Sequence, residues 1–334
     1  MRFLVTGTAG FIGFHLARRL LAEGHVVVGI DAMTAYYSQA LKQRRQAMLA
    51  EFPKFAGHLC MLEEAERLAA IVADAGPEIV IHLAAQAGVR YSAVDPGAYI
   101  SSNVVGTFNL LQALRAGPYP HLLVASTSAV YGASKQMPFE ETQPTDSPRS
   151  LYAATKKATE MLAYNFACQS GTPTTALRLF TVYGPWGRPD MAIFKFTQNI
   201  IEGRPIEVYG SGRMSRDFTY IDDVIEAIRR LIDLPPGAPA IADQEGATAL
   251  PEPPYRVVNV GGSQPVALET FIADIEAAIG RKAERHNLPM QPGDLPATWA
   301  SAARLEQLIG YKPTTPLTAG IRAFVTWYRE EYRV

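Results

Sequence analysis

The sequence predicts an α/β fold, in which a doubly wound parallel sheet is joined to a smaller carboxyl-terminal domain. Short apolar runs alternate with stretches of helical period through the first half of the chain, and a glycine-rich turn follows the first run. After about residue 181 the pattern becomes irregular and rich in Gly, Pro and Arg. Such alternation is typical of parallel sheets with helices on both faces. We expect one domain at 1–180, with a return near 217–260, and a second domain at 181–334.

The first predicted unit is strand, turn, helix and strand. Residues 2–6 form a short apolar run, and residues 14–23 have helical periodicity that Gly24 ends. Residues 25–31 then form a second buried strand that finishes on an acid, Asp31. This order is the arrangement of a dinucleotide-binding site in a Rossmann fold.

The residues of the first turn have distinct expected roles. Gly7 allows a tight turn, Gly10 lets the backbone approach a pyrophosphate at the helix N-terminus, and Gly13 lets helix and strand pack closely. Asp31 can accept hydrogen bonds from the ribose hydroxyls and repels a 2′-phosphate. No arginine follows directly at 32–34. The sequence therefore predicts NAD rather than NADP.

Further elements follow in order along the chain. Strands are predicted at 79–83, 121–125 and 174–180, a loop at 84–90 and a helix at 99–116. Residues 234–254 are rich in Pro and Ala and predict an exposed loop. Because ligands bind at the carboxyl ends of parallel strands, one edge of the sheet should collect Gly7, Asp31, Ala84, Thr127 and Thr181.

Tyr152 and Lys156 stand four residues apart in a stretch that predicts a helix capped at Ser147 or Ser150, in a capping box. Residues at i and i+4 share one helix face, so a phenol and an ammonium point into one site. A nearby cation favours the phenolate. We therefore expect Lys156 to lower the pKa of Tyr152, which would make it a general base.

Composition restricts the class of protein. The chain has 334 residues, 48% hydrophobic and 19% charged, with a formal net charge of -1. This balance argues against nucleic-acid binding. Cys60 and Cys168 cannot form a disulfide framework and suit a reducing compartment. No signal peptide precedes the first strand, no apolar run approaches about 18 residues, and no Cys/His spacing indicates zinc. We expect a cytoplasmic enzyme without metal and without membrane contact.

The motifs together resemble those of the extended short-chain dehydrogenase/reductase family, over residues 1 to about 330. The matching segments are Gly7-x-x-Gly10-x-x-Gly13, Asp31, His82-Leu-Ala-Ala85, Asn103, Ser126-Thr-Ser-Ala-Val-Tyr-Gly132 and Tyr152-x-x-x-Lys156. The resemblance implies bound NAD, held by Gly7, Gly10, Phe11, Ile12, Gly13, Asp31, Leu83, Ala84, Ala85, Asn103, Ser126, Tyr152, Lys156 and Val182.

Within that family the chain is most similar to the UDP-glucuronate 4-epimerases. The similar stretches are Ala84 to Arg90, Ser150 to Lys157, Phe180 to Met191, Arg216 to Asp223 and Met290 to Asp294. The resemblance implies conversion of UDP-glucuronate to UDP-galacturonate through a 4-keto intermediate. Tyr152 would be the general base, with Lys156, Thr127 and Ser128 as the other catalytic residues. It also implies a UDP-sugar site in the second domain, formed with Arg90, Thr127, Ser128, Tyr152, Thr181, Arg188, Phe194, Lys195, Val208, Arg216 and Asp294.

The 4-keto uronate can lose its carboxylate as CO2. Decarboxylating relatives have an acid directly after the Thr-Ser pair, whereas here Ala129 follows Thr127 and Ser128. The sequence therefore favours epimerisation. Hydroxyls of Thr127, Ser128 and Thr181 would hold the carboxylate. Arg188 would pair with the sugar, or alternatively form a loop salt bridge with Asp190.

Alternatives remain open from the sequence. They are a UDP-glucose/UDP-galactose 4-epimerase, a UDP-glucuronate decarboxylase, and a non-catalytic NAD-sensing protein; sensing proteins usually lose the Tyr or the Lys, and this chain keeps both. Acids of the family are replaced by His58, Met61 and Ser301.

A homodimer is expected through helices 99–116 and 152–170, on apolar positions that include Val104, Phe108, Leu111, Met161, Tyr164 and Phe166.

Overall fold

The computed structural model of the chain describes residues 1–117, 119–212, 214–237, 249–250, 253–290 and 295–334. Its central sheet has the strand order β10-β11-β6-β5-β4-β1-β2-β3, and all neighbours pair in parallel except β10, which is antiparallel to β11. The doubly wound parallel sheet that the sequence predicts is confirmed. The strands are β1 Arg2–Thr6, β2 Val26–Asp31, β3 Phe55–Leu59, β4 Ile79–His82, β5 His121–Thr127, β6 Thr174–Leu179, β11 Tyr255–Val260 and β10 Ala249–Leu250.

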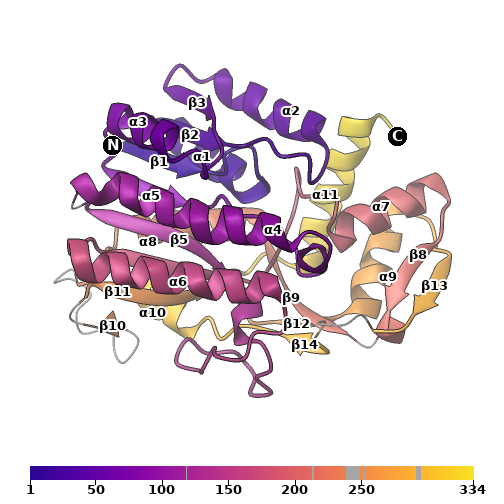
Figure 1. Ribbon diagram of the computed structural model, residues 1–334. Coiled ribbons are helices and arrows are strands. Elements are labelled where there is room, and N and C mark those ends of the chain that lie inside the picture. The colour runs from indigo at the N-terminus through magenta and orange to yellow at the C-terminus, as the bar shows by residue number, and fades with distance from the viewer. Residues whose placement is uncertain (118, 213, 238–248, 251–252, 291–294) are drawn as a thin grey trace.

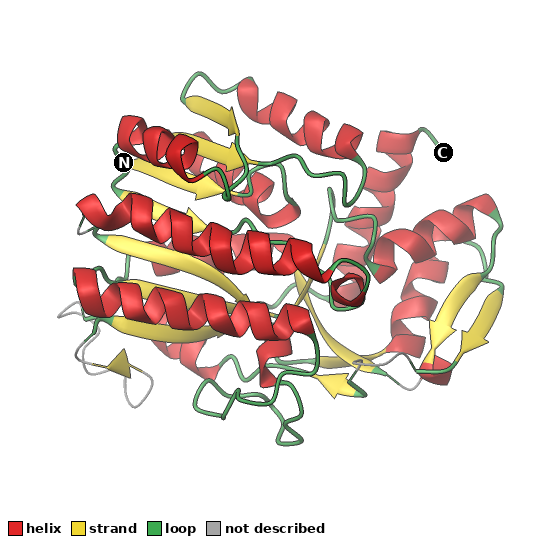
Figure 2. Cartoon of the chain, viewed as in Figure 1, coloured by secondary structure: helices red, strands yellow, loops and turns green. Residues whose placement is uncertain are grey.

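Helices cover both faces of this sheet (Figures 1 and 2). One face packs against α1 Phe11–Ala22, α2 Gln39–Ala50, α8 Ile221–Ile232 and α10 Ala303–Ile309, and the other against α3 Ala65–Ala75, α5 Thr107–Ala113 and α6 Leu151–Ser170. Strands buried on both sides must be apolar throughout. Accordingly, every residue of β4 and β5 is buried.

The segment predicted as one helix at 99–116 is divided in the structure. It runs as α4 Pro96–Tyr99, a π-helical segment Ile100–Gly106, α5, and a 3-10 turn Leu114–Ala116. Within it, Gly106 packs against Leu62, which precedes α3. A Cβ on Gly106 would lie 2.7 Å from the Cβ of Leu62. The helix α6 begins after Ser150, whose side chain accepts from the Ala153 N–H. Ser147 is not the cap, and with Ala153 at the third position the reciprocal half of a capping box is missing.

The remaining elements form a second body beside the sheet, at the right of Figure 1. Its core lies between three helices and a small parallel pair of strands, α7 Ala192–Glu202, α9 Leu268–Ile279, α11 Leu317–Tyr332, β8 Ile206–Tyr209 and β13 Arg285–Leu288. A second small sheet joins β7 Thr181–Tyr183, β9 Ser215–Tyr220, β12 Pro265–Ala267 and β14 Ala297–Thr298. Three further 3-10 turns are Tyr91–Ala93, Ser128–Tyr131 and Gly210–Gly212.

Between these parts the chain crosses back to the large sheet, where α8 packs on α1 and β11 extends the sheet beside β6. The exposed loop predicted at 234–254 differs in part, because residues 249–250 pair with β11 as a strand. Residues 238–248 and 251–252 of that stretch lie outside the described residues. Among the helices that are described, none combines the length and apolarity needed to cross a membrane.

Candidate active site

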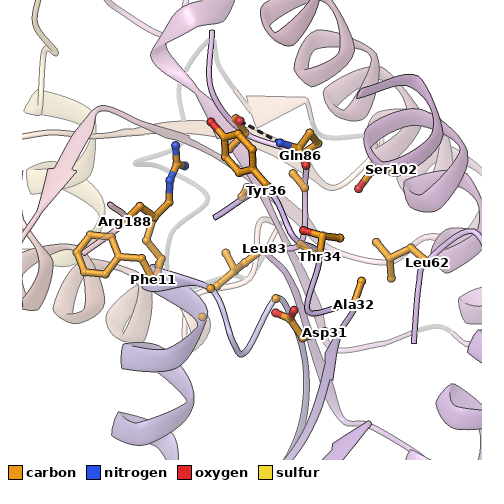
Figure 3. Close-up of a pocket in the computed structure, with 18 of the residues that line it drawn as sticks. Phe11, Asp31, Ala32, Thr34, Tyr36, Leu62, Leu83, Gln86, Ser102 and Arg188 are labelled. Carbon is orange, nitrogen blue, oxygen red and sulfur yellow. Dashed lines mark hydrogen bonds between the residues drawn. The ribbon is translucent and has the colours of Figure 1, made fainter. Parts of the chain in front are cut away.

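A cavity of about 330 Å³ opens at the carboxyl ends of β1, β2, β4, β5 and β6. Figure 3 shows part of its lining, with Asp31 at one end and Arg188 and Tyr36 at the other. The predicted cofactor residues line this cavity with one exception, Asn103. Of the predicted substrate residues, Thr127, Tyr152 and Arg188 line it as well. In the sheet, β1 and β4 are neighbours, and the strands that follow each of them continue toward opposite edges. The cavity opens at this switch point, which is where doubly wound sheets bind ligands.

The turn between β1 and α1 brings bare backbone to the cavity. Gly7 has φ of 84°, which favours glycine, and its N–H donates to the Ile30 carbonyl at 2.6 Å. A Cβ on Gly13 would lie 2.0 Å from the Gly7 carbonyl oxygen, so no larger residue fits this contact. Gly10 caps α1 without a side chain. The first N–H groups of α1 therefore face the cavity and can bind a phosphate.

Asp31 ends β2 with both carboxylate oxygens held by backbone. Oδ2 accepts from the Ala9 N–H at 2.9 Å and Oδ1 from the Met33 N–H at 2.8 Å. These bonds fix the orientation of the carboxylate and leave further lone pairs for hydroxyl donors. Close by in the wall is Lys42, whose ammonium donates to the Thr34 carbonyl at 2.7 Å.

Tyr152 and Lys156 occupy the same face of α6, and both line the cavity together with Thr127. Burial raises the pKa of Tyr152, while a hydrogen bond with Thr127 and the charge of Arg188 oppose this rise. The expected lowering by Lys156 is not found. Burial also lowers the pKa of Lys156 itself, to about 8, against the opposing charge of Glu160. Burial thus opposes ionisation of Tyr152, and Thr127 and Arg188 are the groups that favour it.

Beneath these residues lies a buried ion pair that the sequence did not reveal. Arg178 donates to Glu160 through Nε at 2.9 Å and Nη2 at 3.0 Å, and Ser126 donates to Glu160 Oε1 at 2.6 Å. Both charged side chains are almost fully buried. The pair and Ser126 tie α6 to β5 and β6, next to Thr127 in sequence. No sequence motif predicts this ion pair, because Glu160 fits the pattern of an ordinary helix residue.

Asn103 has a structural position instead of a place in the cavity wall. Its side chain accepts from the Gln86 N–H at 2.7 Å and donates to the Gln86 carbonyl and to Thr155 Oγ1, each at 3.0 Å. It thus holds the loop after β4 against α6. A direct contact of Asn103 with the cofactor stays a prediction; its Oδ1 can accept one further hydrogen bond.

Several predicted substrate residues lie apart from the cavity. Phe194 and Val208 are buried in the second body, where Phe194 packs edge-on against Phe324 and Tyr328. Their apolar side chains fill the core and do not reach the cavity. Lys195 is exposed on α7. Asp294 lies outside the described residues.

The other predicted substrate residues lie at the junction of the two bodies. Arg90 places its guanidinium 4.3 Å from the ring centre of Tyr209, in β8. Arg216, on β9, donates to the Ser215 carbonyl at 2.8 Å. Thr181 begins β7 and is half-buried, as is Ser128 in the turn after β5. The positions where family acids are replaced also differ: Met61 lines the cavity, whereas Ser301 donates its N–H to the Phe139 carbonyl.

Comparison with known proteins identifies the family. Residues 3–241 match the model described as the NAD dependent epimerase/dehydratase family. The chain belongs to this family. It is 52% identical over its whole length to a probable UDP-glucuronate 4-epimerase of Rhizobium meliloti, covering 98% of that protein. It is 41% identical over 98% of its length to UDP-glucuronate 4-epimerase 1 of Arabidopsis thaliana, covering 77% of that protein.

A solved structure shares the whole architecture. The UDP-glucuronic acid 4-epimerase of Bacillus cereus, in complex with UDP-glucuronic acid and NAD, superposes with a TM-score of 0.88 and 32% identity, over 99% of this chain and 100% of that one. The family's cofactor fits the residues present here: a bare helix N-terminus, a fixed Asp31 and the pair of Tyr152 and Lys156 share one cavity. NAD is the cofactor of this chain. No group of three His, Cys, Asp or Glu side chains suited to a metal occurs among the described residues.

Proposed function

We propose that this protein inverts C4 of UDP-glucuronate to give UDP-galacturonate, through a 4-keto intermediate and with the carboxylate retained. One observation carries the proposal: the base Tyr152 and the cation Arg188 line the same cavity, close enough for the charge of Arg188 to act on the phenol. A proton acceptor and an anion receptor thus face one bound sugar. The names of the relatives from Rhizobium meliloti and Bacillus cereus support the same substrate.

The residues divide the chemistry as follows. Tyr152 takes the proton of the 4-hydroxyl as general base, and Thr127 holds the 4-oxygen. Lys156 would orient the cofactor ribose, and Thr127 and Arg188 favour the phenolate. NAD, when bound, supplies the hydride acceptor and returns the hydride, so that no net oxidation occurs. Tyr152 then gives its proton back to the oxygen on the inverted carbon.

Retention of the carboxylate follows from what surrounds it. The turn after Thr127 and Ser128 continues with Ala129, so no acid there can protonate a carbanion. Thr127, Ser128, Thr181 and Arg188 hold the C6 carboxylate, and a held carboxylate cannot rotate its C–C bond into line with the ketone. The loop salt bridge with Asp190 is also present, and it orients Arg188 toward the cavity.

We assign binding of the nucleotide half of the substrate, UDP, to the second body. Arg216 suits the diphosphate because its planar donors match phosphate oxygens. Arg90 at the junction and Lys195 on α7 supply further positive charge. Phe194, Val208 and Asp294 belong to the same proposed UDP site, the first two through their backbone. The domain division at 180 and 181, with its return near 217–260, is part of this proposal.

The decisive experiment is the product formed from UDP-glucuronate, followed by NMR. We expect UDP-galacturonate with little UDP-pentose. Thr181→Ala or Ser128→Ala should raise decarboxylation relative to epimerisation, because the carboxylate becomes free to rotate. Mainly UDP-pentose from the wild type, or faster epimerisation of UDP-glucose, would overturn the substrate assignment.

We also propose a homodimer that forms in the cytoplasm, where the free thiols Cys60 and Cys168 remain reduced. Apolar side chains are exposed on the π-helical segment, α5 and α6, which lie side by side on one face (Figure 1). They are Ile100, Val105, Phe108 and Met161. Leu111 and Phe166, which the sequence assigned to this surface, are buried in the core. A second copy that packs the same helices would cover the exposed set.

A further inference from the structure

Tyr36, in the loop after β2, lies beside the loop that carries Arg188. Its hydroxyl donates to Asp190 Oδ2 at 3.1 Å. Asp190 in turn accepts from Arg188 Nε at 2.9 Å and from Nη2 at 2.5 Å. A chain of hydrogen bonds therefore runs from Tyr36 through Asp190 to Arg188. Tyr36 and Arg188 line the cavity, and Figure 3 shows them on the same side of it.

Asp190 engages only one edge of the guanidinium. Arginine has five N–H donors in a fixed plane, and the Nε edge is the one that Asp190 occupies. The Nη1 end has no hydrogen-bond partner within the part of the chain that the structure describes. Arg188 is thus held from the side, with the other end of its fork free to bind an acceptor in the cavity.

The pair is electrically matched as well as oriented. Burial alone would raise the pKa of Asp190, yet the Arg188 guanidinium and the Tyr36 hydroxyl hold it below its usual value. Burial opposes the charge of Arg188, but Asp190 raises its pKa overall. Both groups therefore stay ionised. The charge of Arg188 is already balanced by Asp190. An incoming carboxylate therefore meets N–H donors that are fixed in place before it binds.

The position of Tyr36 is itself fixed by two neighbouring segments. Its ring packs on that of Tyr91 with centroids 4.6 Å apart. Gly88, in the loop after β4, has φ of 106°, and a Cβ there would lie 2.5 Å from the Tyr36 hydroxyl oxygen. A residue without a side chain leaves the space into which this hydroxyl fits. Loops after β2, β4 and β7 thus meet at one hydrogen bond.

We propose that Tyr36 and Asp190 are positioning residues that make Arg188 a receptor for an anionic sugar, and so set the preference for a uronate over a neutral sugar. The proposal rests on the proposed function. A carboxylate pairs with the open end of the Arg188 fork. A neutral hydroxymethyl group leaves those donors poorly satisfied, and a site built to hydrogen-bond one group discriminates strongly against an analogue without it. Loosening Arg188 should therefore weaken binding of the uronate and spare the neutral sugar.

The test is a comparison of dissociation constants by calorimetry, in NAD-loaded Tyr152→Phe protein, which binds sugars without turning them over. Adding Tyr36→Phe should weaken binding of UDP-glucuronate by about 10-fold or more, as expected for one lost hydrogen bond to a charged group. UDP-glucose should change less than about twofold. Asp190→Asn should cause a larger loss for the uronate. Tyr91→Phe is the matched control: it keeps the packed ring, is not in the hydrogen-bond chain, and should leave both constants unchanged.

The outcomes separate this proposal from the one it rests on. Thermal melting and bound NAD confirm that each variant is folded. Equal weakening of both sugars by Tyr36→Phe, or an unchanged preference in Tyr36→Phe and in Asp190→Asn, would overturn the positioning role while the substrate assignment stands. A parent protein that binds UDP-glucose as well as UDP-glucuronate would overturn both. The positioning role is supported if Tyr36→Phe and Asp190→Asn both lose the preference for the uronate while Tyr91→Phe keeps it.

Discussion

Lys156 carries a stability cost that can be measured. Its side chain is almost fully buried, and burial lowers its pKa from 10.5 to about 8. In the unfolded chain the same lysine keeps its ordinary value. Below pH 8 the folded protein must therefore hold a charge that the unfolded chain holds more easily. The difference corresponds to roughly 3 kcal/mol against folding at pH 7.

Replacing Lys156 by methionine removes that charge and keeps a side chain of similar length. Lys156→Met should raise the free energy of unfolding by about 3 kcal/mol at pH 7, while it abolishes turnover. As the pH rises through 8, wild-type Lys156 loses its proton in the folded state and its cost declines. The advantage of the variant should fall to about 1.5 kcal/mol at pH 9.5 and vanish above 10.5.

Urea unfolding of NAD-free protein at pH 7 and pH 9.5 measures both values, with other titrating groups cancelling in the difference between variant and wild type. Lys157→Met is the control: the neighbouring lysine is 24% exposed and pairs with Glu160 at 3.5 Å, so its loss should change stability by less than about 1 kcal/mol. A Lys156→Met protein that is less stable than wild type at pH 7, or an advantage that grows with pH, would refute the reasoning.

Two further predictions concern catalysis and assembly. Tyr152→Phe should lower turnover about 10²- to 10⁴-fold and leave NAD bound, measured by product NMR and by extraction of nucleotide; near-wild-type turnover would remove Tyr152 from the mechanism. Phe108→Asp should convert a dimer to monomers at micromolar concentration in light scattering, because it places a charge in the exposed apolar face, whereas the distant Val334→Asp should not. A wild-type monomer, or a Phe108→Asp dimer, would count against that interface.

The fold was predictable because its signals are local. The run at 2–6, the three glycines and the acid at 31 each have a meaning within a few residues, and β1, α1 and β2 begin or end within three residues of the predicted bounds. The helix at 99–116 was harder. Its sequence pattern predicts a helix but not the π-helical segment Ile100–Gly106, where Gly106 packs closely on Leu62 from another segment.

The site was predictable to the extent that single elements carry it. Tyr152 and Lys156 are placed together by one helix, and Thr127 by the end of one strand. Tyr36, Asp190 and Gly88 could not be found in this way, since each takes its role from a contact between distant segments: 154 residues separate Tyr36 from Asp190. The pKa of Tyr152 was misjudged for a similar reason. Spacing on a helix reports which charges are near, but the cost of burying a phenolate depends on the surrounding fold.

Lys156 and Arg188, two of the cations that line the cavity, are suited to different tasks by their partners. Glu160, the acid one turn beyond Lys156, is already bound by Arg178 and Ser126, so it offsets the burial of Lys156 only in part and the pKa stays near 8. Arg188 pairs with Asp190 through both Nε and Nη2, Asp190 also accepts from Tyr36, and Arg188 remains charged at any relevant pH. With a pKa near 8, Lys156 can gain or lose a proton when the charge on Tyr152 changes. A permanently charged arginine in a fixed orientation cannot respond in this way, but it can recognise an anion without altering its own protonation. The site therefore separates proton chemistry from anion recognition by giving each cation a different counterion.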